Sequence, residues 1–467
     1  MDKSMRPDDR RVGIFLHSSD DNEPFAVGTL WLDPDRGVTA EIPFFPNIQP
    51  QFTTPARWFA DGPPENIHFR SEHLQVGMFG CTRSRVSSPM HIDVGGLRVR
   101  ETVLTERTGP VEDPLTVSTF SSRIDGLTEW TRLSSVSWSG EQVADERGSR
   151  RRRVTYVIEQ AQGLSWAQGE ARMSLNTTWR PKENAPRNGV HMEDDVVLRS
   201  KFSSPRPIAD HLAEHRKFRD LLQFSYGIPA SFRGHQVRDS RFPTLSAVGD
   251  VVAVESQDVF CSITVPEHFR EPLGSNALSF PIVRIDDVTA DTLTLWAHKY
   301  DALKRVIYPT SGVLRRSGLF AEDKVLNGAM SVEALGRLLP PAPGEAATFS
   351  KHSKRKTTAT DFYRAMDYLG VDVSAIAGHR SHLAWAMANT YNRVKHADRG
   401  DFPEGVHSHV SGMLTLVLVR LALLKLLLPM SPAIQSFVDG WGFGQVVESI
   451  RQRGVRADAL GEFVTES

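Results

Sequence analysis

The sequence is poor in cysteine, because its 467 residues include only Cys81 and Cys261. Neither cysteine belongs to a Cys-x-x-Cys pair, which excludes a disulfide-stapled scaffold and a zinc or redox motif of that type. So few thiols are typical of a reducing compartment, and the charged N-terminus, MDKSMRPDDRRVGIF, lacks the apolar core of a secretory signal. The sequence therefore predicts a cytoplasmic protein.

The chain also lacks an excess of charge of either sign. It has 55 Lys and Arg against 56 Asp and Glu, a net charge of −1, with 40% hydrophobic and 24% charged residues. This composition excludes wholesale disorder, and any surface that binds nucleic acid must be local. The length predicts two or three domains of about 150 residues each.

A long hydrophobic run is missing as well. The most apolar stretch, MLTLVLVRLALLKLLL from Met413 to Leu428, has 16 residues and includes Arg420 and Lys425. At about 1.5 Å per residue, this run is shorter than the roughly 30 Å hydrocarbon core of a bilayer. We therefore expect a buried core helix and no membrane partner.

Nucleotide and metal motifs are also missing. The chain has no Gly-x-x-x-x-Gly-Lys-Ser/Thr loop and no Gly-x-Gly-x-x-Gly turn. His211 and His215 are four positions apart on a predicted helix, but Leu212 stands where a zincin has glutamate. We expect structural or surface histidines here, and neither a metal nor a cofactor.

The pattern of residues predicts an α+β fold, with a β-rich N-terminal domain followed by an all-α helical bundle. Runs such as FAVGTLWL, RVTYVIE and DDVVLRS lie between Gly, Pro, Asp and Asn clusters, which is typical of strands. A helix is expected from Asp210, and the chain is helical from about Thr292 to its end. We place the boundary near Asp291, which gives domains 1–291 and 292–467.

The helical domain is the basic one, since residues 292–467 hold 21 Lys and Arg against 16 Asp and Glu. The segment from Pro340 to Thr358 has two adjacent prolines and four cations, so it predicts an exposed loop. This loop is either simply solvated or a patch that attracts RNA. A second basic run, RGSRRRRV from Arg147 to Val154, predicts a hairpin loop.

The segment from His379 to Gly400 predicts a helix from about Ser381 to Ala397. At about 100° per residue, one face of that helix is apolar and the other is polar. A histidine that titrates near neutral pH and arginines that bind phosphate share the polar region. The pattern indicates either a phosphate-handling surface or a solvated face. The apolar face contains Leu383, Met387, Thr390, Tyr391 and Val394, and the opposite face contains Trp385, Asn389, Asn392, His396 and Arg399.

Within this segment, TYNRVKHAD (Thr390 to Asp398) is similar to the Arg-Asn-x-x-x-His motif of HEPN domains, especially those of ApeA-like anti-phage proteins. The order of a strand-rich and then a helical domain also resembles that family. FAVGTLWLDPDRGVTAEIPFF resembles the opening strands of the ApeA N-terminal domain, and HLAEHRKFRDLLQFSYGIPASF resembles its internal helix. MSVEALGRLL, with Glu333, resembles the first HEPN helix.

The resemblance implies an abortive-infection effector: a metal-independent HEPN endoribonuclease in which the RNA 2′-hydroxyl attacks and a cyclic phosphate remains. It also implies a homodimer, because two HEPN domains pair to form one composite site. The RNA is unknown, with tRNA as one candidate, and a phage-derived or nucleotide trigger would act on the N-terminal domain. The implied catalytic residues are Asn392, Arg393 and His396, and the RNA-binding residues are Lys395, Arg399, Lys351, Lys354, Arg355 and Lys356.

The sequence departs from the family motif at its arginine, whose position is occupied by Tyr391. A tyrosine on the apolar face cannot replace a guanidinium, and Arg393, about 60° from His396 around a helix, is the nearest substitute. Enzymatic activity therefore stays open. The alternatives are a catalytically inactive HEPN protein that binds RNA or dimerises and has a ligand-sensing N-terminal domain, or an unrelated helical bundle.

Overall fold

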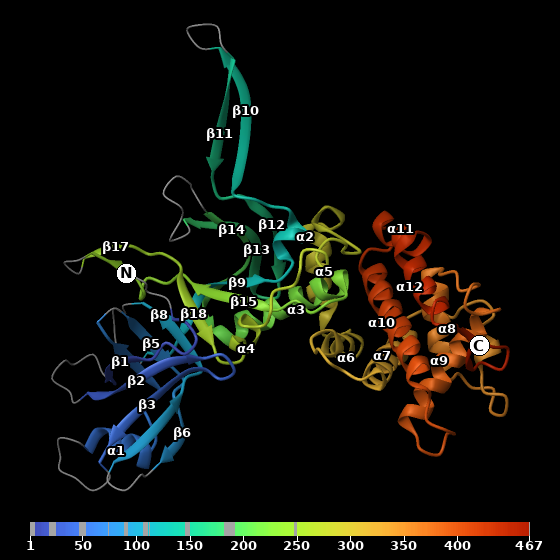
Figure 1. Cartoon of the computed structure of the whole chain (residues 1–467), viewed down its shortest axis with the longest axis horizontal. Helices are drawn as coiled ribbons and strands as arrows, with labels where there is room; N and C mark the ends of the chain where they lie inside the picture. Colours follow the sequence, from blue (N-terminus) through green and yellow to red (C-terminus); the bar gives the residue numbers. More distant parts are fainter. Residues whose placement is uncertain are drawn as a thin grey trace. The chain divides into compact units, whose positions relative to one another are not determined.

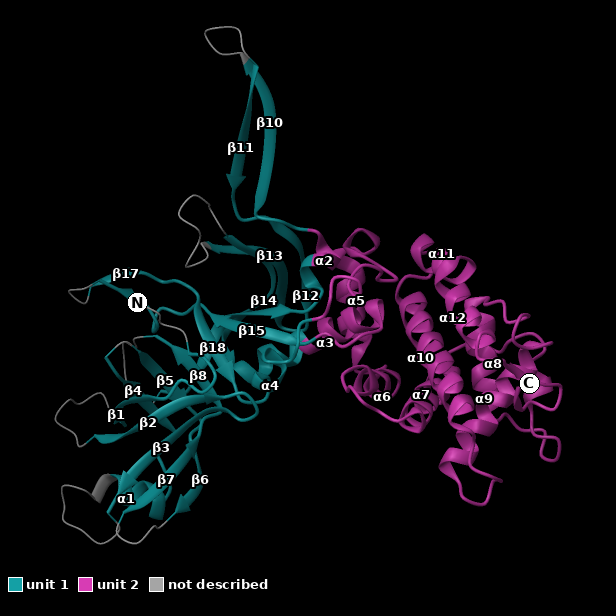
Figure 2. Ribbon diagram, in the orientation of Figure 1, with its two compact units in different colours: residues 1–128, 133–215, 231–272 teal, residues 129–132, 216–230, 273–467 magenta. Residues whose placement is uncertain are grey.

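The computed structural model describes residues 5–17, 25–45, 53–72, 74–87, 92–105, 111, 113–144, 150–181, 192–246 and 250–466 (Figure 1). The chain forms two compact units (Figure 2). Unit 1 comprises residues 1–128, 133–215 and 231–272, and unit 2 comprises 129–132, 216–230 and 273–467. A strand-rich N-terminal region followed by a helical region confirms the predicted α+β fold.

Unit 1 contains a sheet of fourteen strands, in the order β12-β13-β14-β9-β15-β18-β8-β5-β4-β1-β2-β3-β7-β6, in which neighbours pair antiparallel. In β2 every second residue is buried, because one side chain in two points to the core, whereas all four residues of β8 are buried. The sheet strands are β1 (Arg11–Leu16), β2 (Ala26–Asp33), β3 (Gly37–Phe44), β4 (Asn66–Arg70), β5 (Gln75–Phe79), β6 (Thr82–Ser87), β7 (Asp93–Arg98), β8 (Glu101–Leu104), β9 (Thr116–Ile124), β12 (Gln162–Gln168), β13 (Ala171–Pro181), β14 (Met192–Pro207), β15 (Phe232–Val237) and β18 (Gln257–Cys261).

Among the described residues of unit 1, two strand pairs lie outside this sheet: β10 (Val136–Ala144) with β11 (Arg150–Ile158), and β16 (Thr244–Leu245) with β17 (Val251–Ala253). Arg150 to Val154 are therefore in a strand and not in the predicted hairpin loop, while residues 147–149 lie outside the described residues. The short helices near the sheet are α1 (Thr53–Ala60), α2 (Leu127–Thr131) and α4 (Val265–His268).

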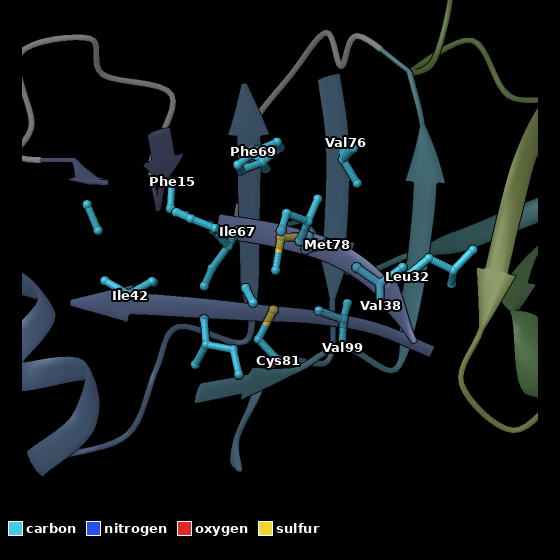
Figure 3. Close-up of a cluster of buried hydrophobic side chains, with 14 of the residues drawn as sticks. Phe15, Leu32, Val38, Ile42, Ile67, Phe69, Val76, Met78, Cys81 and Val99 are labelled. Carbon is cyan, nitrogen blue, oxygen red and sulfur yellow. The ribbon is translucent and has the colours of Figure 1, made fainter. Parts of the chain in front are cut away.

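The strands nearest the N-terminus pack around a core of aromatic and aliphatic side chains (Figure 3). Phe15 and Phe69 are fully buried, and their ring centroids are 4.9 Å apart. Cys81 lies in the same cluster, and burial raises the pKa of its thiol. This free thiol is therefore a protonated core residue.

The helix predicted from Asp210 is α3 (Ile208–Tyr226), and its part in unit 1, residues 208–215, packs on β9 and β14. Its buried histidines join serines of the sheet in a hydrogen-bonded chain. Ser200 Oγ is 2.7 Å from His211 Nδ1 and 2.9 Å from His215 Nε2. Ser122 Oγ connects His215 Nδ1, at 2.7 Å, to His235 Nδ1, at 2.8 Å.

Both ends of this histidine–serine chain reach other hydrogen-bonding groups. His211 Nε2 is 2.9 Å from the Val117 carbonyl oxygen, and His235 Nε2 is 2.9 Å from Thr264 Oγ1. Burial lowers the pKa of His211 and lowers that of His215 well below its usual value, so both imidazoles are neutral at pH 7. The two histidines have a structural role in the core of unit 1.

Unit 2 is a helical bundle that ends in a short hairpin, which the sequence did not predict. Its elements are η2 (Ile285–Asp287), α5 (Ala290–Tyr300), α6 (Lys304–Leu314), α7 (Ala321–Gly336), η3 (Glu345–Thr348), α8 (Thr358–Leu369), α9 (Arg380–Lys395), α10 (Gly405–Leu427), α11 (Pro432–Asp439), α12 (Trp441–Arg451), β19 (Val455–Ala457) and β20 (Phe463–Thr465).

The central helix, α10, is longer than its apolar run because its first two turns, from Gly405 to Gly412, are more polar. Its 23 residues are enough to cross a membrane by length and composition, but 67% of the apolar window is buried within the protein. Glycines bring α7 and α10 close together. A Cβ at Gly328 would lie 2.6 Å from Thr415 Cγ2, and one at Gly412 would lie 2.9 Å from Lys324 Cβ.

Candidate functional site

The candidate site lies on α9, whose packing was predicted from sequence. The Ser381 amide donates to His379 Nδ1 at 3.1 Å, which caps the start of the helix. Four residues of the predicted apolar face are buried, and Val394 is half-buried. The buried residues are Leu383, Met387, Thr390 and Tyr391.

The helix ends at Lys395, two residues before the predicted end. The His396 amide donates to the Asn392 carbonyl oxygen at 2.8 Å, but the His396 backbone is extended, with φ −130° and ψ 115°. His396 and Arg399 therefore belong to an exposed turn, and the angles of a helix do not place them beside Asn392. The imidazole of His396 is accessible to solvent.

Tyr391, which replaces the motif arginine, holds a cation next to His396. Its ring is 2% exposed. Lys395 Nζ donates to the Tyr391 hydroxyl at 2.9 Å and lies 5.0 Å from the centroid of the ring. This hydrogen bond and the negative charge of Glu333 raise the pKa of Lys395. Tyr391 thus positions an ammonium one residue before His396.

The carboxylate of Glu333 acts on this ammonium, and it acts in turn on a second carboxyl group, that of Asp361. Glu333 of α7 accepts a hydrogen bond from Thr358 Oγ1, at the start of α8, at 2.8 Å. Burial and the negative charge of Glu333 raise the pKa of Asp361, on α8, to about 7. The sequence alone does not single out Asp361, because its shifted pKa arises from burial and from Glu333, which is 28 positions earlier in the chain.

Arg393, the predicted substitute for the motif arginine, lies on another side of α9. Two positions correspond to about 200° around a helix, so Arg393 points away from Tyr391 and Lys395. Its Nη2 donates to Glu462 Oε1 at 2.9 Å. Asn389 Nδ2 donates to the same oxygen at 3.0 Å. The turn between β19 and β20 therefore covers part of the predicted polar face.

The turn that contains His396 nevertheless passes close to Arg393. Gly400 has a φ of 103°, and a Cβ built there would lie 3.5 Å from Arg393 Nε. His396 thus belongs to a segment with Lys395 at its start and Arg393 near its end. Lys395 directly precedes His396 in the chain, and the structure fixes its ammonium on Tyr391. Arg393, in contrast, is held in an ion pair with Glu462.

The basic loop leads directly into the same end of α8. Lys351, Lys354, Arg355 and Lys356 are exposed, as expected. The loop is closed by backbone bonds of 2.9 Å from the Lys354 amide to the Ser350 carbonyl oxygen and from the Ser350 amide to the Arg355 carbonyl oxygen. Since Thr358 bonds to Glu333, whose charge acts on Lys395, these loop cations and the end of α9 share one end of the bundle.

A buried ion pair anchors the segment before this loop. Arg364 Nε donates to Glu345 Oε2 at 2.6 Å, and Arg364 Nη2 donates to Glu345 Oε1 at 2.9 Å. The hydrogen bond from Arg364 lowers the pKa of Glu345 to about 2. The Ala342 amide also donates to Glu345 Oε2. The pair therefore fixes η3 on α8.

Residues 10–241 match the family model described as ApeA N-terminal domain 1. The chain belongs to the ApeA-like proteins. This assignment places it in an anti-phage defence family, in agreement with the resemblance found in the sequence. The matched segment extends from β1 to just before β16, so it does not include the helices of unit 2 that contain the candidate site. Neither a curated protein nor a solved structure significantly matches the chain.

In the described part of this ApeA-like protein, no three His, Cys, Asp or Glu side chains are grouped so that they could bind a metal ion. The candidate site instead combines one exposed histidine, a positioned lysine, exposed cations and a carboxyl group with a pKa near neutrality. Such groups can attract a phosphate and move protons.

Proposed function

We propose that this ApeA-like protein is an abortive-infection effector whose helical unit is a HEPN-like endoribonuclease. The observation that supports this most is the exposed His396 directly after Lys395, whose ammonium is fixed by the buried Tyr391. Lys395 would supply the positive charge that the motif arginine supplies in the family. RNA as the substrate and the cytoplasm as the location are parts of this proposal.

The proposed reaction requires two proton transfers and no metal. The 2′-oxygen attacks phosphorus and forms the cyclic phosphate, and the bond from phosphorus to the 5′-oxygen breaks. One base accepts the 2′-hydroxyl proton, and one acid gives a proton to the 5′-oxygen. His396 would take one of these roles, Asn392 would orient the 2′-hydroxyl, and Lys395 would hold a phosphate oxygen.

A second copy of the chain would supply the other proton carrier. In a homodimer, His396 of each copy would face one RNA phosphate, so that one imidazole acts as base and the other as acid. Lys351, Lys354, Arg355 and Arg399 would attract the RNA backbone without sequence preference. A phage-derived or nucleotide trigger acting on the N-terminal domain would release the activity.

The test is cleavage of total RNA and of tRNA in EDTA, with analysis of the product ends. Wild-type protein should leave cyclic phosphates, and His396→Ala should lower the rate about 100-fold or more. Lys395→Ala should lower it less, because the loop cations remain. His352→Ala is the matched control, since His352 is an exposed histidine of the basic loop and should be dispensable.

The assay should be repeated with lysate from phage-infected cells, which would contain the trigger. Cleavage that persists in His396→Ala would rule out the proposed site. A mixture of His396→Ala with a second inactive variant, Asn392→Ala, tests the composite site, because a shared site gives mixed dimers an activity different from that of either variant alone.

A second candidate function is an inactive HEPN-like module that binds RNA or dimerises. It is favoured by the buried Tyr391 at the motif position and by the pairing of Arg393 with Glu462. On this hypothesis wild-type protein leaves RNA intact even with infected lysate, yet it still binds RNA or forms a dimer in light-scattering measurements.

A further inference from the structure

The β10–β11 ribbon of unit 1 is a separate two-stranded element. Its nine residue pairs run from Val136 opposite Ile158 to Ala144 opposite Arg150, and no strand of the fourteen-stranded sheet pairs with it. Figure 2 shows the ribbon extending from the rest of unit 1. At about 3.3 Å per residue, each strand is about 30 Å long. Every residue of β11 is exposed.

One face of this ribbon combines aromatic rings with guanidinium groups. Trp138 and Tyr156 are opposite each other and are 64% and 66% exposed. Because side chains alternate between faces, Arg152 and Arg150 lie on the same face, closer to the tip. The Trp138 ring and the Arg152 guanidinium approach one another over Gly140. A Cβ there would lie 3.7 Å from Trp138 Cζ3 and 3.8 Å from Arg152 Nε.

On the opposite face of the ribbon an arginine is paired with a carboxylate, so that face serves as an internal control. Arg153 lies there opposite Glu141, and the two side chains form an ion pair at 3.2 Å. No carboxylate pairs with Arg152 among the described residues. The aromatic face is therefore the face with an unneutralised guanidinium beside two exposed rings.

Packing within the protein does not explain two large rings that are about two-thirds exposed. An opposed aromatic pair does stabilise a ribbon, but by only about 0.2–1 kcal/mol. Exposed rings flanked by arginines fit a polyanion with flat bases, because bases stack on aromatic rings and guanidinium groups bind phosphates. An acidic protein would satisfy the arginines but would not use the flat faces of the rings.

We propose that the β10–β11 ribbon binds single-stranded RNA, with bases stacked on Trp138 and Tyr156 and phosphates held by Arg150 and Arg152. The choice of RNA among nucleic acids rests on the proposed function, whereas the binding of a single strand rests on the ribbon alone. This surface is in unit 1 and is distinct from the candidate site on α9.

The test is fluorescence anisotropy of the full-length protein with a labelled oligouridylate of about 12 nucleotides. A 2′-O-methyl backbone prevents cleavage through the 2′-hydroxyl, so binding is measured independently of nuclease activity. The Trp138→Ala/Tyr156→Ala variant should bind at least about tenfold more weakly. Trp138→Val/Tyr156→Val should lose as much, although valine favours strands and keeps the ribbon formed.

Arg152→Ala and Arg153→Ala form the matched pair of arginine variants. Arg152→Ala should weaken RNA binding and reduce the slope of log affinity against log salt concentration by about one, the value of one lost phosphate contact. Arg153→Ala should have a smaller effect, because Arg153 is already paired with Glu141. Unchanged affinity in both aromatic double variants would overturn the proposal. So would stronger competition by polyglutamate than by unlabelled RNA, which would indicate an acidic protein partner.

The proposal and the nuclease hypothesis fail in different ways. Binding of the uncleavable oligonucleotide that depends on Trp138 and Tyr156, without any cleavage of natural RNA, would refute only the nuclease. Cleavage with no loss of binding in the ribbon variants would refute only the ribbon. An oligomer that dissociates in those variants, with RNA affinity unchanged, would also overturn the ribbon proposal and assign this face to contacts between copies.

Discussion

Each unit contains a buried polar network, and the histidine–serine chain of unit 1 differs in charge state from the Glu345–Arg364 pair of unit 2. In unit 1, the neutral imidazoles of His211 and His215 are buried in a chain of hydrogen bonds that also includes His235 and two serines. Unit 2 buries the ionised pair of Glu345 and Arg364. A neutral chain satisfies its donors and acceptors without the cost of desolvating a charge, whereas an ion pair depends on both partners. The two units should therefore respond differently to substitution and to pH.

The largest effect is expected from breaking the ion pair. Arg364→Met leaves the buried Glu345 with only the half-exposed Lys356, whose Nζ is 3.9 Å from Oε1, so the free energy of unfolding of the helical unit should fall by up to roughly 3 kcal/mol. Thermal denaturation followed by circular dichroism measures this loss as a lower melting temperature. Arg355→Met, at an exposed arginine of the neighbouring loop, is the control and should change stability little.

The double variant Glu345→Leu/Arg364→Met sharpens the same comparison. If the loss in Arg364→Met comes from an uncompensated charge, removal of both charges should restore much of the stability. A double variant no more stable than Arg364→Met would show that packing, and not charge, dominates at this position.

The next largest effect is acid sensitivity of unit 1. The pKa values of His211 and His215 are lowered in the folded protein, so below the unfolded-state value of about 6.5 the unfolded chain takes up protons that the folded chain does not. Stability should fall by up to about 1.4 kcal/mol per pH unit for each histidine between pH 6 and pH 5. Melting curves recorded over this range measure the effect.

His211→Gln and His215→Gln should each reduce this pH dependence, whatever they do to stability at pH 8. His352→Gln, in the exposed basic loop, should leave it unchanged. If the pH dependence of stability in both core variants equals that of the wild-type protein, the assignment to the buried histidine–serine chain is wrong.

The smallest effect, with the opposite sign, is expected at Asp361 in unit 2. Its pKa is raised to about 7, so the folded protein favours the protonated carboxyl, and this contribution is lost as pH rises from about 4 through 7. Asp361→Asn should therefore stabilise the helical unit at pH 8 by on the order of 1 kcal/mol, since solvent screens a half-buried group. At pH 4 the gain should disappear, and a gain equal at both pH values would contradict this assignment.

The sequence predicted the elements whose pattern is local. The helix from Asp210 and the apolar face of α9 follow from spacing along one element, and the antiparallel strands follow from turn residues between β-branched runs. The strand expected from RVTYVIE begins earlier than predicted, at Arg150, because four consecutive arginines hide the strand pattern. The charge states were missed because His235 and Ser122, or Glu345 and Arg364, meet only after folding.

The position of His396 shows the same limit at the candidate site. Helical angles placed it on the face of Asn392, but the helix stops at Lys395. The role of Lys395 depends on the depth at which Tyr391 is buried, which the motif alone does not contain. The pairing of Arg393 with Glu462 depends on a hairpin that follows almost 70 residues later.

The division of α3 between the two units decides how the protein can be dissected. Asp220, in the second half of this helix, accepts hydrogen bonds from Tyr300 at 2.5 Å and from Ser311 at 2.6 Å, both in the helical bundle. A gene fragment that starts near Thr292 would encode the bundle without this carboxylate and without the helix that bears it. A circular permutation that keeps 216–230 attached to 273–467 suits this chain better than a single cut near Thr292.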